Sequence, residues 1–337
     1  MSVNMKDVAD LAGVSQRTVS NVVNDYVHVK PATRRRVQEA ITTLKYRPNI
    51  NAQKLRQGRS GILALALPEI AVPYFADLAN YVQQVAEKRG VTVLIDQTGG
   101  NPEREFLVLD GYRSNLIDGL IFSPLAITPE QLMAHDLDFP VVLLGERIGS
   151  SEYLHVSVDN VAAATQATSH LLAQGRRRIA VVGAPSEFTV GPGPARMRGY
   201  EIAMQEADVT VDPRLVIQTT QWTRAEGYAI ARQLVADTLP FDAVFCFNDL
   251  LGVGVLKGLL DEGVAVPEKV SVVGWDDNDE TLFSTPTLST ISPDKRQLAR
   301  VAVDGLLGLI AGTSEIPNGQ CDYSLVVRGS SRQLATL

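Results

Sequence analysis

Near the N-terminus, apolar positions recur at helical spacing in two short segments separated by a glycine. The first predicted helix begins at Met5, because the Asn4 side chain can accept hydrogen bonds from its free N–H groups. Gly13 allows a tight turn, and Ser15 is a suitable cap for a second helix from Gln16 to about Asn24. The apolar positions expected to be buried are Val8, Leu11, Ala12, Val19, Val22 and Val23. The second helix would expose polar side chains that can bond base edges, as in a helix-turn-helix unit.

A third amphipathic segment begins at Pro31, a residue that suits the first helical position because its missing N–H group costs nothing there. Pro48 disfavours helix at the residue before it and so ends this segment. Residues 49–57 have enough length for two helical turns, which are unstable alone in water. Two interpretations remain open: a helix that orders against DNA, with Leu55 wedged into the minor groove, or a flexible linker with an incidental leucine.

From Gly61 onward, short apolar runs alternate with amphipathic stretches, which predicts parallel sheets covered by helices on both faces. The runs expected to be buried strands are Ile62–Leu67, Val91–Ile95, Ile117–Phe122, Val141–Leu144, Ile179–Val182, Leu215–Ile217, Ala243–Phe247 and Val270–Val273. The sequence of Ile62–Leu65 is similar to that of Ile179–Val182, so we expect two similar α/β subdomains.

The charge distribution changes how this pattern is interpreted. The chain of 337 residues has a net charge of −7, which by itself argues against a nucleic-acid partner. Residues 1–60, however, hold eleven Lys and Arg against four Asp and Glu, a net charge of +7 that leaves −14 for the remainder. A small basic head on a large acidic body favours a polyanionic partner for the head.

Several classes of protein are disfavoured. Two cysteines, Cys246 and Cys321, are too few for a disulfide framework or a cysteine metal site, and the four scattered histidines lack metal-ligand spacing. No serine elbow is present, so we expect neither an enzyme nor a cofactor. No apolar stretch approaches membrane-spanning length and no basic leader precedes an apolar core, so we expect no membrane partner and a cytoplasmic location.

Several motifs together resemble the lactose and purine repressor family (LacI/GalR). In the head they are Met5–Ala9, Ala12–Ser15, Thr18–Ser20, Val22 and Asn24, and in the linker they are Leu44–Asn49, Leu55–Arg56 and Gly58–Gly61. The chain departs from the family pattern at Lys30–Pro31, where a polar cap and an acid are usual, and at Asn51, where alanine is frequent. The body from Gly61 onward also resembles the family's core, which is similar to periplasmic sugar-binding proteins.

The resemblance implies a small all-α helix-turn-helix head plus an α/β core with two subdomains, parallel sheets and a periplasmic-binding-protein-like fold. Residues 1–60 would form the DNA-binding head, with a hinge helix at about 49–57, and residues 61–337 the effector-binding and dimerisation core. Within the core, one subdomain would comprise about 61–160 and 292–320, and the other about 161–291 and 321–337.

The resemblance also implies which residues contact double-stranded operator DNA. Gln16, Arg17 and Asn21 would read bases in the major groove, and Leu55 would intercalate at the centre of a near-palindromic operator. The expected DNA-binding residues are Ser15, Gln16, Arg17, Thr18, Ser20, Asn21, Asn24, Tyr46, Asn49, Ala52, Leu55 and Arg56.

Ligands of open parallel sheets lie beyond the carboxyl ends of the strands, so polar and aromatic residues just after the strands are candidate effector contacts. They are Tyr74, Phe75, Ser123, Arg147, Arg196, Trp222, Asn248, Asp249 and Asp276. Asp, Asn and Arg can bond neighbouring hydroxyl groups, and Trp can cover the C–H face of a sugar, so we expect a sugar or related metabolite. The family's ligand contacts carry over to Phe75, Arg196, Trp222, Asn248 and Asp276.

Each candidate also has a purely structural interpretation. Helix capping explains one of Asn248 and Asp249 without a ligand, and it is the expected role of Asp159. Phe75 could belong to the core. Arg196 is the strongest candidate, because an unpaired buried cation would be costly.

We therefore expect a homodimeric transcriptional regulator, a repressor, that a small-molecule effector switches from the cleft between the core subdomains. The alternatives are a core that responds to a partner protein and an α/β enzyme with a DNA-binding head. The identity of the effector and the sign of its action stay open.

Overall fold

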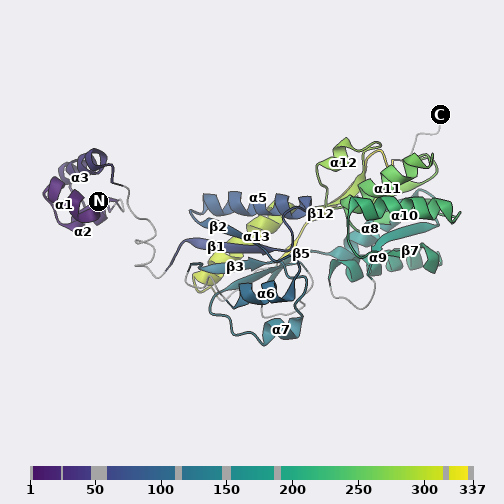
Figure 1. Cartoon of the computed structure of the whole chain (residues 1–337), viewed down its shortest axis with the longest axis horizontal. Coiled ribbons are helices and arrows are strands. Elements are labelled where there is room, and N and C mark those ends of the chain that lie inside the picture. The colour runs from purple at the N-terminus through teal and green to yellow at the C-terminus, as the bar shows by residue number, and fades with distance from the viewer. Residues whose placement is uncertain are drawn as a thin grey trace. The chain divides into compact units, whose positions relative to one another are not determined.

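The computed structural model describes residues 3–23, 26–46, 59–110, 116–145, 153–185, 191–313 and 319–332. The chain divides into two compact units, Met1–Ser60 and Gly61–Leu337 (Figure 1). The predicted hinge helix at 49–57 lies outside the described residues.

The first unit is a three-helix head made of α1 (Met5–Ala12), α2 (Gln16–Val23) and α3 (Pro31–Leu44). Its core consists of Val8, Ala9, Ala12, Val19, Val22, Val37 and Ala40. The Asn4 cap is confirmed, because its Oδ1 accepts from the N–H groups of Lys6 and Asp7 at 2.8 and 3.2 Å. Gly13 ends α1 in the left-handed region, with φ of 64°, as the turn requires.

One position of the predicted head core is wrong. Leu11 is 54% exposed, whereas Ala9 is buried. The buried face of α1 therefore runs through Val8, Ala9 and Ala12, and Leu11 lies on its flank. Lys30 makes no side-chain bond to the start of α3, as its departure from a polar cap predicts.

The first half of the second unit is built on a six-stranded sheet in the order β11-β5-β4-β3-β1-β2. All of its strand pairs are parallel. The strands are β1 (Ile62–Leu67), β2 (Thr92–Gln97), β3 (Gly119–Phe122), β4 (Val141–Leu144), β5 (Leu154–Val158) and β11 (Gln320–Cys321). The helices of this half are α5 (Pro73–Lys88), α6 (Pro102–Leu109), α7 (Pro129–Met133) and α13 (Lys295–Ile310). Alternate residues of β1 face opposite layers: Leu63 and Leu65 pack with α5 and α13, and Ala64 and Ala66 pack with α6 and α7.

The second half contains another six-stranded sheet, in the order β12-β10-β9-β8-β6-β7. Its strands are β6 (Ile179–Ala184), β7 (Val216–Gln218), β8 (Ala243–Cys246), β9 (Ser271–Trp275), β10 (Ser289–Pro293) and β12 (Tyr323–Val326). Its helices are α8 (Asn160–Ala173), α9 (Pro192–Glu206), α10 (Arg224–Ala236), α11 (Asp249–Asp261), the short α12 (Glu280–Phe283) and the 3₁₀ turn η1 (Pro213–Leu215). The sheets are parallel as expected except at one edge of the second sheet, where β12 pairs antiparallel with β10.

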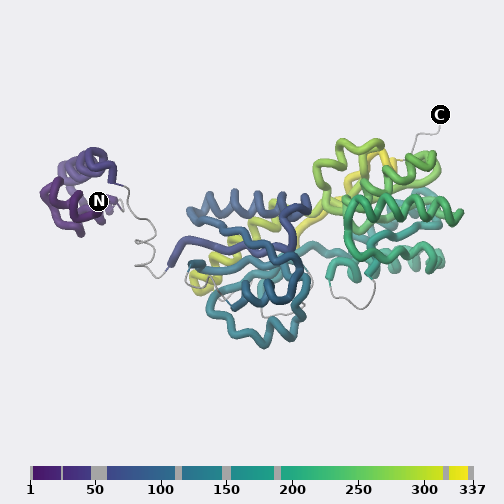
Figure 2. Tube along the Cα trace, viewed as in Figure 1, coloured from purple at the N-terminus to yellow at the C-terminus, as the bar shows by residue number. Residues whose placement is uncertain are grey.

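The eight predicted strands are present, with ends shifted by up to two residues, but β5, β10, β11 and β12 were not predicted. The chain passes between the halves after β5, after β10 and after β11 (Figure 2). The expected subdomain boundaries move slightly, because Ser292 and Pro293 still pair within the second sheet. Cys321 pairs with Val158 in the first sheet rather than belonging to the second half.

Two absences hold for the residues described above. None of their helices combines the length and the apolar character that crossing a membrane requires. No group of three or more His, Cys, Asp or Glu side chains in these ranges is arranged to hold a metal ion.

Candidate functional site

A cavity of about 150 Å³ opens between the two halves of the second unit, at the carboxyl ends of the strands. Of the predicted effector contacts, Tyr74, Phe75, Ser123, Arg196, Trp222, Asn248 and Asp276 line it. Apolar side chains complete its walls, and they are Val72, Leu78, Pro124, Leu125, Leu144, Val156, Val158, Pro192, Trp275, Pro293 and Leu298. A few polar groups on an apolar wall are the usual composition of a small-molecule site.

Arg196 projects from α9 and is only 7% exposed. Its Nε donates to Asn160 Oδ1 at 2.7 Å, and its Nη1 donates to the carbonyl oxygen of Phe247. The guanidinium carbon lies 4.0 Å from the ring centre of Trp275 and 5.4 Å from that of Trp222. Hydrogen bonds and aromatic faces therefore hold the guanidinium at the cavity wall.

Asp276 follows β9 directly and faces the cavity with 6% of its surface exposed. Burial raises the pKa of its carboxyl to about 7, although the positive charges of Arg196 and Lys295 oppose this rise. The nearby Asp77 carboxylate adds to the upward shift of this pKa. Asp276 therefore changes its charge near neutral pH.

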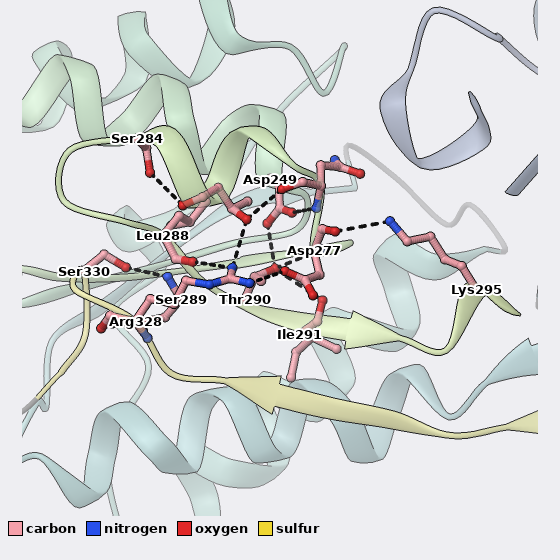
Figure 3. A network of polar contacts seen from close by, with 12 residues as sticks. Asp249, Asp277, Ser284, Leu288, Ser289, Thr290, Ile291, Lys295, Arg328 and Ser330 are labelled. Atoms are coloured by element: carbon pink, nitrogen blue, oxygen red, sulfur yellow. Dashed lines mark hydrogen bonds and ion pairs between the residues drawn. The ribbon is translucent and has the colours of Figure 1, made fainter. Parts of the chain in front are cut away.

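Asn248 and Asp249 have different roles, although they are adjacent in the sequence. Asn248 caps α11 by accepting from the Leu251 N–H at 2.9 Å, and it also lines the cavity. The Asp249 side chain does not line the cavity, so its prediction as an effector contact is wrong. Its carboxylate accepts from the Thr290 hydroxyl at 2.6 Å and from the Asn278 N–H at 2.9 Å (Figure 3). Burial, together with the charge of Asp276, raises the pKa of Asp249 well above its ordinary value.

Three polar or aromatic cavity residues, Ser157, Asn160 and Trp275, were missed from the sequence. Asn160 is 4% exposed and orients Arg196 through its side-chain oxygen, while its Nδ2 donates to Val158 O at 3.3 Å. The alternation in Leu154–Val158 would have placed Asn160 just after a strand. Trp275 is the last residue of β9, and the predicted run ended at Val273.

Phe75 and Asp159 both have the structural roles that the sequence allows for them. Phe75 packs against the main core, which confirms its structural interpretation, and it also lines the cavity. Asp159 accepts from the Ala162 N–H at 2.9 Å, which confirms it as the cap of α8. Arg147 lies outside the described residues.

The head places the predicted base-reading residues on α2. Gln16 and Arg17 are exposed, and Thr18, Ser20 and Asn21 are partly exposed. Ser15 caps α2, because its Oγ accepts from the Thr18 N–H at 3.1 Å and lies 3.0 Å from the Thr18 hydroxyl oxygen. Tyr46 is half-buried against the head core. Asn24, Asn49, Ala52, Leu55 and Arg56 lie outside the described residues.

Comparison with known proteins agrees with this architecture. Residues 4–49 match the model of bacterial regulatory proteins of the lacI family, and residues 168–331 match that of a periplasmic binding protein-like domain. The chain is 32% identical to the transcriptional regulator GalS of Salmonella typhimurium, over 99% of each chain. It is 29% identical to the transcriptional repressor CytR of Escherichia coli, over 98% of this chain and 96% of that protein.

Solved structures show the same relationship. The Lac repressor dimer bound to operator and the anti-inducer ONPF has a TM-score of 0.87 and 25% identity, covering 98% of this chain and 99% of that one. A complex of the transcriptional regulator CelR with cellobiose has a TM-score of 0.71 and 30% identity, covering 97% of this chain and 99% of that one. These relatives are DNA-binding transcriptional regulators and not enzymes. The chain therefore belongs to the LacI family of DNA-binding transcriptional regulators.

Proposed function

We propose that the protein is a homodimeric repressor that binds a near-palindromic operator and is switched by a small-molecule effector, a sugar or related metabolite, in the cavity. The observation that carries the effector proposal is the cavity itself, which both halves line. Ser123 and Phe75 come from the first half, and Arg196, Asn248 and Asp276 come from the second. The operator complex of the Lac repressor dimer and the cellobiose complex of CelR support the proposal by similarity.

For the DNA contact, the exposed Gln16 and Arg17 on α2 supply side chains that can bond base edges. The net charge of +7 in residues 1–60 favours the phosphate backbone. One short helix reads few base pairs, so two heads related by a two-fold axis would read the two halves of the operator.

For the switch, a ligand that touches both halves binds more tightly to one of their relative arrangements. The operator affinity then changes by the difference between the ligand's affinities for the two arrangements. A sugar fits the chemistry of the cavity, because Asp276 and Arg196 offer an acceptor and a donor beside the faces of Trp222 and Trp275.

The test begins with selection of bound duplexes from a random DNA pool, followed by affinity measurements with a panel of sugars and nucleosides. We expect a near-palindromic sequence and at least one compound that changes its affinity. Equal affinities with every compound, together with no ligand-induced rise in melting temperature, would favour a core that responds to a partner protein.

The Arg196→Ala variant assigns the response to the cavity. We expect it to abolish the effect of the active compound on operator affinity, while operator affinity without the compound stays at the wild-type value. Removing Arg196 leaves Asn160 and the Phe247 carbonyl without their donors, so stability should fall by about 1–3 kcal/mol. Arg198→Ala, an exposed arginine on the same helix, is the matched control and should keep the full response.

A further inference from the structure

The turn that follows β9 has a backbone conformation that residues other than glycine rarely adopt. Asp276 has φ of 113° and Asp277 has φ of 53°. Two consecutive aspartates with positive φ persist only where surrounding contacts hold them, and such strain often accompanies a functional site. The contacts that hold residues 276–278 therefore decide where the Asp276 carboxyl points.

A buried pair, Asp249 on α11 and Thr290 on β10, contacts this turn (Figure 3). Asp249 Oδ2 accepts from the Asn278 N–H at 2.9 Å, and Asp249 Oδ1 accepts from the Thr290 hydroxyl at 2.6 Å. The Thr290 oxygen in turn accepts from the Asp277 N–H at 3.4 Å. Both side chains are fully buried, so their hydrogen bonds are not exchanged for bonds to water.

Arg328, just after β12, holds the same turn through a side chain. Its Nη2 donates to Asp277 Oδ1 at 2.6 Å. Its Nη1 donates to Thr281 Oγ1 at 2.9 Å and to Leu288 O at 3.0 Å, which anchors the guanidinium (Figure 3). Asp277 is thereby drawn toward Arg328, while its neighbour Asp276 faces the cavity.

Gly274, on β9 two residues before Asp276, leaves space for this arrangement. A Cβ atom at that position would lie 2.4 Å from Asp249 Oδ1, which is closer than any real contact. From the other half, Lys295 Nζ donates to Asp277 O at 3.2 Å and to Asp77 Oδ2 at 2.6 Å. The turn is therefore contacted on several sides by groups that do not line the cavity.

We propose that Asp249, Thr290 and Arg328 are positioning residues of the effector site, which hold residues 276–278 in the conformation that points the Asp276 carboxyl into the cavity. The name effector site rests on the proposed function. The positioning itself is a property of the protein without any ligand, and it is tested as such.

The two tryptophans of the chain, Trp222 and Trp275, both line the cavity and provide the probe. The full-length protein is labelled with 5-fluorotryptophan, and its two fluorine resonances are followed from pH 4 to 9. The charged groups around Asp276 are Arg196 on α9, Lys295 on α13, Asp77 on α5 and the nearby Asp249 and Asp277. We expect a transition near pH 7 in the wild type that is absent in Asp276→Asn.

The decisive comparison is Thr290→Val against Thr290→Ser. Valine keeps the shape but removes the hydroxyl, so the turn should relax and Asp276 should become hydrated. The pH midpoint of the fluorine transition, which reports the titration of Asp276, should then fall by at least about one pH unit, toward the ordinary aspartate pKa of about 4. Serine keeps the hydroxyl and should keep the wild-type midpoint. Arg328→Gln and Gly274→Ala should also lower the pH midpoint of this transition, as Thr290→Val does.

Arg176→Gln is the matched control for general loss of stability. Arg176 also anchors backbone carbonyls of the second half, those of Pro267 at 2.6 Å and Lys269 at 3.1 Å. We expect this variant to melt at a lower temperature while its midpoint stays near pH 7.

Two results would overturn the proposal: wild-type midpoints in folded Thr290→Val and Arg328→Gln, or a transition that persists in Asp276→Asn. A chain that binds no operator, by contrast, would refute the proposed function and leave the titration result standing.

Discussion

Arg196 and Asp276 face the same cavity, but their surroundings act on them in opposite ways. Arg196 is held by Asn160 and the Phe247 carbonyl, both of which accept hydrogen bonds from a cation. Asp276 is buried strongly enough that its pKa rises to about 7 in spite of Arg196. At the scale of single residues, the site therefore combines one permanent charge with one that depends on pH.

The raised pKa of Asp276 makes a prediction about stability. The folded state keeps the proton up to about pH 7, whereas the unfolded chain releases it near 3.8. The contribution of Asp276 is therefore fully present below pH 3.8 and is lost as the pH rises through 7. The loss amounts to up to about 4 kcal/mol. Urea unfolding from pH 4.5 to 8 should show this decline in the wild type but not in Asp276→Asn, and parallel curves would contradict it.

A second prediction at this scale concerns α2. Arg17 is exposed on the helix that would enter the major groove, so Arg17→Ala should relax the base preference of the protein. One bidentate contact discriminates by about 1–3 kcal/mol, which selection from a random DNA pool can measure. Arg35, exposed on α3, serves as the control. Arg35→Ala should weaken binding to all sequences equally, and an unchanged base preference in Arg17→Ala would exclude its reading role.

At the scale of elements, glycines set how closely helices approach each other. Gly227 on α10 and Gly254 on α11 lie where the two helix backbones meet. A Cβ atom at Gly254 would lie 2.1 Å from Arg224 O, and one at Gly227 would lie 2.3 Å from Leu251 O. Both obstacles are backbone atoms, so relief requires the helices to move apart. Because Asn248 and Asp249 begin α11, such a movement would reach the cavity.

Gly254→Ala should therefore lower the free energy of unfolding by about 1–3 kcal/mol or more, the usual cost of overpacking. The matched control is Gly308→Ala on α13, where the nearest atom to the added Cβ lies 3.8 Å away. That variant should gain about 0.5–1 kcal/mol, because alanine loses less backbone entropy than glycine in a helix. Chemical denaturation measures both changes, and equal effects would show that close packing does not decide the outcome.

At the scale of the whole molecule, the net positive charge lies in the first unit and the cavity lies in the second. The basic head carries +7 and the remainder −14, so attraction to DNA is concentrated in the first unit. The two halves of the second unit share three crossings, and the cavity lies between them. A ligand in that cavity would contact both halves at once, which is the arrangement that linkage between two states requires.

The concentrated charge predicts a steep salt dependence of operator binding. If a dimer neutralises about 6–10 phosphates, its affinity should fall by about 10³–10⁵ between 50 and 200 mM salt. Fluorescence anisotropy with a labelled operator measures this slope. A nearly flat slope would show that the positive charge of the head does not meet the phosphate backbone.

The sequence by itself determined the head helices, eight of the strands and the family, because these depend on short-range periodicity and contiguous motifs. It also singled out Arg196 and Asp276, which both line the cavity, and Asp276 does so because polar residues after parallel strands collect at one edge of a sheet. Only the tertiary structure decided that Asp249 turns away from the cavity toward Thr290 and that Arg328 holds Asp277. It alone also paired β12 antiparallel with β10. The physical reason is sequence separation: these contacts join residues some 30 to 50 positions apart, and no local pattern specifies which distant partner a buried polar group will find.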